Sequence, residues 1–345
     1  MSIIAEYIWI DGNASYRSKY KTISQKNEIW KEPWNYDGSS TDQATTEKSE
    51  IFLHPVYTCI HPFLENSIIV LCDTYIDFEC TQPAKCNYRY KANQMYEKYK
   101  QCMPTFGFEQ EYFFMSYESD KQFSLDSNKK HWKIEHFHNN FTNPQGPYYC
   151  GNGGQIIIHR DLALKHYKAC LTAGLKISGL NAEVAPSQWE FQIGPVIGIQ
   201  SGDQLHVARF LLERIAEMDG KKIEWKPKPL KSPWNGSGLH TNFSTMKTMD
   251  AKNGYMELIK SIEHAGLSHK DDLTYYGDNS ERLCGSCETS NKDNFTYGVA
   301  DRKASVRIPT QVEKQGFGYL EDRRPASDAD PYHIIERMVQ AFIVL

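Results

Sequence analysis

The segment Phe106–Met115 constrains the fold and the site of this chain most strongly, because it places two acidic residues within a run of aromatic ones. Read as a β-strand, it turns Phe108 and Tyr112 to one side, since side chains alternate along a strand. Glu109 and Glu111 then share the other side. Carboxylates this close in apolar surroundings repel each other, and one takes up a proton unless a positive charge lies between them. The ordinary alternative is a solvent-facing polar edge, so the hypothesis of an acidic site requires matching ligands elsewhere.

The length and composition are typical of an ordinary globular protein. The chain has 345 residues, of which 40% are hydrophobic and 24% charged, and its formal net charge is −4. This length favours two domains over one, and the charge gives no bulk basic field for nucleic acid. The apolar run Ser67–Cys72 is too short to cross a membrane, and the N-terminus lacks the basic region of a signal peptide. Nine scattered cysteines suit a reducing compartment, so we expect a cytoplasmic protein.

The order of the expected elements indicates an α+β protein. The β-branched, apolar stretch 67–76 is typical of a buried strand, and Thr81–Ala84 then breaks the pattern. We therefore expect a small β-rich N-terminal domain at residues 1–82 and a larger domain at 83–345. Residues 116–143 are polar and weakly patterned, which indicates a long surface excursion. The expected helices are 91–102, 161–173, 202–218, 254–269 and the segment from Pro331 onward, whose proline suits a first helical turn.

Further strand-like stretches repeat the acidic pattern. The hairpin 181–193 carries Glu183 and Glu190 on polar faces, His240 alternates with apolar neighbours, and Glu321 lies in a similar row. A lone glutamate is more often at the surface, and a lone histidine is more often structural. Five glutamates and one histidine on such faces are hard to explain as independent accidents. Oxygen ligands with one imidazole suit Mg²⁺ or Mn²⁺ better than zinc, and such metals commonly manage phosphate oxygens.

Four arginines accompany these residues, namely Arg282, Arg302, Arg307 and Arg323. Guanidinium groups match phosphate and carboxylate oxygens in pairs. Any one of the four could be a surface residue, but together they favour a clamp for an anionic substrate and a transferring phosphoryl group. The chain has no phosphate-binding Gly-x-x-x-x-Gly-Lys-Ser/Thr loop and no dinucleotide fingerprint. A nucleotide would therefore have to bind through metals and arginines.

At these residues the chain closely resembles the eukaryotic-type (type II) glutamine synthetase family. The matching segments follow the order of the family along nearly the whole chain, and together they are far more specific than any single short motif. They are Trp34–Thr41, Phe108–Tyr112, Pro144–Cys150, Asn181–Val184, Gln188–Pro195, Asn235–Ser244, Glu288–Asn291, Ala304–Pro309 and Glu321–Pro325.

The resemblance implies a fold, an activity and an assembly. The fold would combine a small β-grasp N-terminal domain with a larger catalytic domain, built on a curved antiparallel sheet with flanking helices. The activity would be ATP-dependent ligation of ammonium to L-glutamate, giving L-glutamine, ADP and phosphate through γ-glutamyl phosphate, with two or more Mg²⁺ or Mn²⁺ ions per site. The assembly would be a homo-oligomeric ring, two stacked pentamers, with each active site between neighbouring subunits.

The resemblance also implies roles for individual residues. One metal would be held by Glu111, Glu183 and Glu190, and a second by Glu109, His240 and Glu321. The expected ATP contacts are Glu109, Glu190, Asn242, Phe243, Ser244, Arg302, Arg307 and Tyr319. The expected glutamate contacts are Trp234, Asn235, Gly236, Arg282 and Arg323. The expected catalytic residues are Asp37 and Glu288, which would bind and deprotonate ammonium, and Arg302 and Arg323, which would stabilise the transferring group.

Some positions depart from the family pattern. Cys287 precedes Glu288, where a histidine is usual, and Asp301 stands where an asparagine commonly precedes the nucleotide-site arginine. The excursion at 116–143 is longer and more basic than usual. Two alternatives to glutamine synthesis remain. A non-enzymatic relative should have lost some of the six metal ligands or four arginines, and none is lost. A γ-glutamyl ligase for another amine is disfavoured by Asp37 and Glu288, which suit ammonium.

Overall fold

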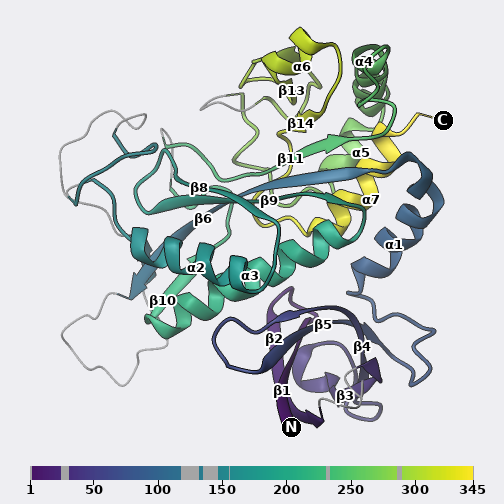
Figure 1. The fold of residues 1–345 in the computed structure, drawn as a ribbon, viewed down its shortest axis with the longest axis vertical. Coiled ribbons are helices and arrows are strands. Elements are labelled where there is room, and N and C mark those ends of the chain that lie inside the picture. The colour runs from purple at the N-terminus through teal and green to yellow at the C-terminus, as the bar shows by residue number, and fades with distance from the viewer. Residues whose placement is uncertain are drawn as a thin grey trace.

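The chain forms two β-sheets with helices between and around them (Figure 1). The computed structural model describes residues 2–24, 31–117, 132–134, 147–154, 156–230, 234–285 and 290–344. Most of the predicted excursion at 116–143, and also Cys287 and Glu288, lie outside these residues.

The first sheet contains the predicted N-terminal strands, in the order β2-β1-β5-β4-β3. Neighbouring strands are antiparallel, except that β1 and β5 run parallel. One face is aromatic, because Tyr7 and Trp9 pack against Trp34 and Tyr36. Ile8 points to the other face and joins the core shared with the second sheet. The strands are β1 (Ser2–Ile10), β2 (Tyr16–Ser24), β3 (Trp34–Asp37), β4 (Glu50–Ile60) and β5 (Ser67–Tyr75).

The second sheet is larger and carries the acidic segments. Its strands follow the order β12-β13-β14-β11-β6-β9-β8, and both β7 and β10 pair with β6. These pairings are antiparallel except for β12 with β13, so the predicted antiparallel sheet is mixed at this edge. The strands are β6 (Thr105–Tyr117), β7 (Trp132–Ile134), β8 (Ile177–Ala182), β9 (Gln188–Ile197), β10 (Lys221–Glu224), β11 (Leu239–Ser244), β12 (Tyr297–Val299), β13 (Val306–Ile308) and β14 (Leu320–Asp322).

The five predicted helices are present within a few residues of their expected bounds. The predicted helix 254–269 ends at Gly266, because the backbone amides of Leu267 and Ser268 turn back to nearby carbonyls, and a short helix follows. In the part of the chain described here, no helix has the length and apolar character needed to span a membrane. The helices are α1 (Tyr88–Tyr99), α2 (Arg160–Thr172), α3 (Gln200–Met218), α4 (Gly254–Gly266), α5 (His269–Leu273), α6 (Thr310–Gln315) and α7 (Pro331–Phe342).

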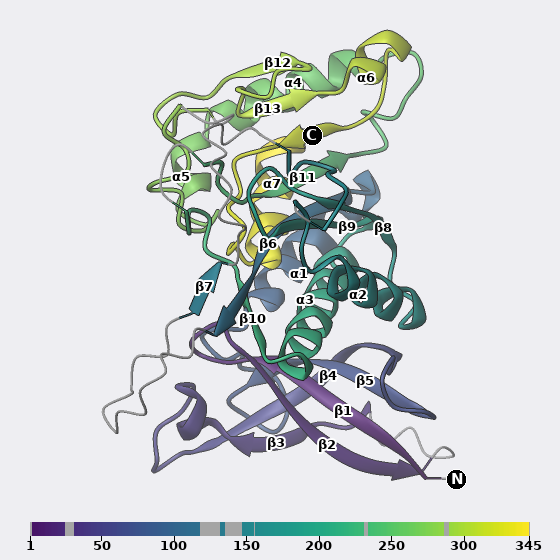
Figure 2. The same cartoon turned by 90° about the vertical axis from the view of Figure 1, so that its left-hand side faces the viewer.

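Helix α3 lies between the two sheets and supports the strands that carry the acidic residues (Figures 1 and 2). It packs against β6 and β9, and most of its side chains are buried. Polar contacts also join it to neighbouring elements, for example through Asp203 and His206. Arg89 of α1 donates to both carboxylate oxygens of Asp203, at 2.7 and 3.0 Å. Tyr16 of β2 shares a 2.8 Å hydrogen bond with His206. The strands that carry the acidic residues are therefore supported by a packed core on the side of α3.

Candidate active site

The register of the second sheet gathers the acidic residues into adjacent rows. Residues that lie opposite each other on neighbouring strands form a row across the sheet, and their side chains lie close together on one face. Residues two apart on one strand share that face and belong to adjacent rows. The first row is Asn181, Glu190 and Glu111. The second row is Gly179, Gln192, Glu109 and His240. The third row is Asn242, Glu321 and Arg307. The two glutamates of β6 thus belong to different rows.

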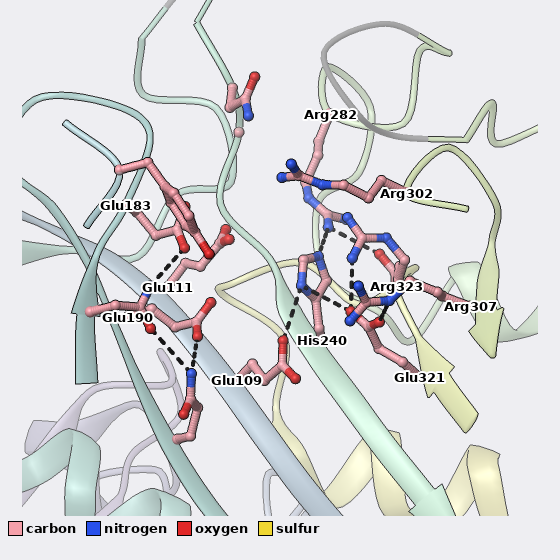
Figure 3. A pocket seen from close by; sticks show the side chains of 15 residues that line it. Glu109, Glu111, Glu183, Glu190, His240, Arg282, Arg302, Arg307, Glu321 and Arg323 are labelled. Atoms are coloured by element: carbon pink, nitrogen blue, oxygen red, sulfur yellow. Dashed lines mark hydrogen bonds and ion pairs between the residues drawn. The ribbon is translucent and has the colours of Figure 1, made fainter. Parts of the chain in front are cut away.

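Glu111, Glu183 and Glu190 form a first cluster of buried carboxylates (Figure 3). One oxygen of each lies within 4.8 Å of one oxygen of each other member. The backbone amide of Gly238 donates to Glu111 at 2.5 Å. Asn181 donates to one oxygen of Glu183 at 2.9 Å, and the backbone amide of Val184 donates to the other at 3.1 Å. These donors hold the carboxylates in place with one oxygen of each close to the other two members.

Glu109, His240 and Glu321 form a second cluster beside the first. Nδ1 of His240 lies 3.7 Å from Glu109 and 3.6 Å from Glu321. The Glu321 carboxylate is fully buried and is bound by two arginines, Arg323 at 2.8 Å and Arg307 through its Nε. This cluster therefore combines acceptor groups with cations that already neutralise one of them.

Burial dominates the electrostatics of both clusters. It raises the pKa of Glu111, Glu183 and Glu190 above that of an ordinary glutamate, and for Glu183 and Glu190 the neighbouring carboxylates raise it further. Burial also lowers the pKa of His240, and Arg323 lowers it further, so its imidazole is neutral and able to bind a metal. Carboxylates held this closely, with one neutral imidazole, fit divalent cations that prefer oxygen ligands.

Two adjoining cavities open at these clusters. The polar cavity has a volume of about 320 Å³ and contains both clusters together with Arg282, Arg302, Arg307 and Arg323. The apolar cavity has a volume of about 530 Å³ and includes Phe106, Phe108 and Met249 in its wall. Glu109 and Gln192 line both cavities. An elongated ligand with an anionic end and a flat apolar end would find matching surfaces along this path.

Most residues predicted for the site reach one of these cavities. The polar cavity is lined by Glu109, Glu111, Glu183, Glu190, Asn235, Gly236, His240, Arg282, Arg302, Arg307, Glu321 and Arg323. The apolar cavity is lined by Glu109, Asn242, Phe243, Ser244 and Tyr319. Asn242 also donates to Glu109 at 2.8 Å, which joins the two sets.

Two predicted residues lie elsewhere in this chain. Trp234 lines neither cavity, because its ring packs edge-on against Tyr148 with 5.9 Å between the centroids. Asp37 lies at the end of β3, at the outer edge of the first sheet. Its carboxylate accepts hydrogen bonds from both Ser39 and Ser40, led by the Ser39 hydroxyl, and these lower its pKa. It is therefore an exposed, ionised carboxylate that does not meet the cavities of its own chain.

Comparison with known proteins places this architecture in a family. The sequence model for the catalytic domain of glutamine synthetase matches residues 87–270. A glutamine synthetase of Tuber borchii is 47% identical over 343 residues, which cover 98% of this chain and 92% of the relative. The chain belongs to the glutamine synthetase family. A relative from Agaricus bisporus, also named glutamine synthetase, is 45% identical over 99% of this chain and 94% of its own. Glutamine synthetase cytosolic isozyme 2 of Vitis vinifera is 44% identical over 99% of this chain and 95% of its own length.

Membership of the glutamine synthetase family supports the use of ATP and divalent metal ions, which agrees with the donor set of the two clusters. Some residues of this site were not predicted from the sequence. Asn181, Gln192 and Tyr149 all line the polar cavity. A signal for Gln192 was present, because it shares the polar face of its strand with Glu190. The contribution of Met249 to the apolar cavity depends on tertiary packing, for which no local pattern exists.

Proposed function

We propose that this chain catalyses the ATP-dependent ligation of ammonium to L-glutamate, giving L-glutamine, ADP and phosphate through γ-glutamyl phosphate. The observation that carries the proposal is the pair of acidic clusters, which share a polar cavity with four arginines and adjoin an apolar cavity. A carboxylate is a poor acceptor for ammonia, and phosphorylating it supplies a good leaving group. That step requires cations on both the glutamate side and the phosphate side of one site.

The two clusters suit different halves of the reaction. We assign Glu111, Glu183 and Glu190 to a cation near glutamate, and Glu109, His240 and Glu321 to a cation near the ATP phosphates. Mg²⁺ or Mn²⁺ suits both donor sets, and when bound it would neutralise phosphate oxygens and polarise the transferring group. Asn242, Phe243, Ser244 and Tyr319 are placed to hold the nucleoside because they line the apolar cavity.

The arginines are assigned to charge stabilisation. Arg307 and Arg323 bind the buried carboxylate of Glu321 in this structure, so they are positioned to turn toward phosphate oxygens when a cation takes that carboxylate. Arg302 would stabilise the same transferring group. Arg282 lines the polar cavity together with Asn235 and Gly236, and its guanidinium lies 3.2 Å from the imidazole of His240, which suits a contact with the glutamate carboxylate.

Ammonium is not nucleophilic and must lose a proton before it attacks. We assign this task to Asp37 and to Glu288, which lies outside the described residues. Asp37 is ionised and lies away from the cavities of its own chain, so it would act on the site of a neighbouring subunit. This supports a ring assembly, and we propose that the ring consists of two stacked pentamers. A cytoplasmic location is supported by the name of the Vitis vinifera relative.

The substrate is tested by product analysis with glutamate, ATP and Mg²⁺. We expect phosphate release to require ammonium and to be matched by glutamine. Release driven by ethanolamine or a polyamine, but not by ammonium, would replace this proposal with a γ-glutamyl ligase for another amine. Absence of release with every amine would indicate a non-enzymatic relative.

Cation binding should depend on pH in a defined direction. Burial raises the pKa of Glu111, Glu183 and Glu190, so without a cation these groups retain protons that an unfolded chain would already have lost. The stability of the metal-free protein should therefore fall as pH rises above the usual glutamate range, whereas the gain from a cation should grow. We expect saturating Mg²⁺ to raise the melting temperature more at pH 8 than at pH 6, measured by calorimetry. An increment that is equal or smaller at pH 8 would contradict this view of the first cluster.

A further inference from the structure

Gln192 occupies an unusual place between the two acidic clusters. Its backbone lies in the second row, with Glu109 opposite on β6 and Gly179 opposite on β8. Its side chain instead reaches the first row, and it lines both the polar and the apolar cavity. A single neutral side chain thus stands where the two clusters and the two cavities meet.

The carboxamide of Gln192 connects two members of the first cluster. Its Nε2 donates to the carboxylate of Glu190 and to Oδ1 of Asn181, the latter at 3.2 Å. Nδ2 of Asn181 in turn donates to Glu183 at 2.9 Å. The nitrogen of Gln192 is the atom that faces Glu190, and it can donate to this carboxylate once a bound cation has displaced its proton. The amide of Gln192 therefore orients Glu190, and the amide of Asn181, which accepts from Gln192, orients Glu183. Each amide donates its N–H to one carboxylate.

Gly179 provides the room for this arrangement. A Cβ atom built on Gly179 would lie 1.6 Å from Oε1 of Gln192 and 2.7 Å from its Cδ, which no packing adjustment of a few tenths of an ångström could relieve. The three atoms nearest to that Cβ all belong to Gln192. A side chain at position 179 would thus displace the carboxamide of Gln192 before it met anything else.

We propose that Gln192 is a positioning residue that orients Glu190 directly, and Glu183 through Asn181, for a divalent cation, and that Gly179 is required because it leaves space for this side chain. The proposal rests on the proposed function, because it assumes that the first cluster binds such a cation. Groups that orient metal ligands typically contribute about 10- to 100-fold to metal affinity. Gln192 itself would contact neither the cation nor the reacting atoms.

A double-mutant cycle on metal binding tests the proposal without any turnover. Mn²⁺ serves as the probe, and its free concentration is followed by electron paramagnetic resonance with wild type, Gln192→Ala, Gly179→Ala and the double variant. Each single change should weaken the tighter Mn²⁺ binding by about 10- to 100-fold. The double variant should match Gln192→Ala within about twofold, because the clash disappears with the displaced side chain.

Additional variants separate positioning from folding. Gln192→Met keeps the length of the side chain and removes its amide, so it should weaken binding like Gln192→Ala if the hydrogen bonds matter. Gln101→Met is the matched control, because Gln101 is exposed in a short 3-10 helix and its amide donates to the carbonyl of Lys98 at 3.4 Å, and this variant should bind Mn²⁺ like wild type. Melting temperatures of all variants report whether each protein is folded.

The possible outcomes separate this inference from the proposed function. Wild-type affinity in Gln192→Ala or Gln192→Met would overturn the positioning role, even if the protein makes glutamine. Losses that multiply in the double variant would overturn the role assigned to Gly179. If wild type binds Mn²⁺ and the cycle behaves as expected, but no glutamine forms, the proposed function fails and the positioning role stands. If wild type binds no Mn²⁺, the inference fails together with the metal assignment.

Discussion

Replacing Glu190 by alanine is expected to lower ammonium-dependent phosphate release by about a thousand-fold, since a divalent cation in such a site supplies several kcal/mol of charge stabilisation. The variant should nevertheless fold. Without a cation, Glu190 is a buried carboxylate beside Glu109, Glu183 and Glu111, all of which raise its pKa in addition to burial. Removing it abolishes the cost of burying this carboxyl group beside the others, so the melting temperature of the metal-free variant should be no lower than that of wild type.

The measurement is the initial rate of phosphate release, with calorimetry of the same metal-free samples. Glu97→Ala is the matched control, because Glu97 lies on α1 with 51% of its side chain exposed and pairs with Lys100. It should retain wild-type activity. Substantial activity in Glu190→Ala would show that this carboxylate is not needed for catalysis. A large fall in melting temperature would show instead that Glu190 supports the fold.

Subunits that are each inactive should restore activity when they assemble together. Asp37 lies at the outer edge of the first sheet, whereas Glu190 lies in the polar cavity of the second. If one subunit supplies Asp37 to the cavity of its neighbour, Asp37→Ala alone should cost about a hundred-fold or more, as loss of a general base does. A random one-to-one mixture with Glu190→Ala should regain roughly a quarter of wild-type activity, since half of the donors and half of the acceptors are intact.

The mixture is prepared by co-expressing the two variants with different tags and purifying the mixed assemblies. Assemblies of each variant alone are the controls and should stay inactive. A mixed assembly as inactive as its parents would contradict the proposal that the site is completed across a subunit boundary.

Periodicity and a family resemblance made much of this architecture predictable. The alternation in Phe106–Met115 correctly separated Phe108 and Tyr112 from Glu109 and Glu111, because β6 is a regular strand with one face against the core. Helix starts such as Pro331 were also predictable, since Asp330 caps that helix through a local hydrogen bond.

Other features depend on long-range register, which no local pattern encodes. Glu109 lies opposite His240, while Glu111 lies opposite Glu190, and only the pairing of β6 with β11 and β9 decides this. The contacts of Gln192 have the same origin. Trp234, which the resemblance implies for the glutamate site, packs its ring against Tyr148, a contact that depends on the fold. The parallel pairing of β12 with β13 was likewise invisible in such short strands.

We propose that two adjacent rows of one sheet assign the neighbouring residues Glu109 and Glu111 to different halves of the reaction. It is tested most directly by comparing Glu109→Gln with Glu111→Gln, both of which keep the size of the side chain. Glu109 lines the apolar cavity and accepts a hydrogen bond from Asn242, whereas Glu111 is bound by the amide of Gly238.

Steady-state kinetics with ATP and glutamate varied in turn is the decisive measurement. We predict that Glu109→Gln raises the KM for ATP well above that of Glu111→Gln, while Glu111→Gln mainly impairs the use of glutamate. Equal defects in ATP affinity for the two variants would contradict the division of labour between the rows.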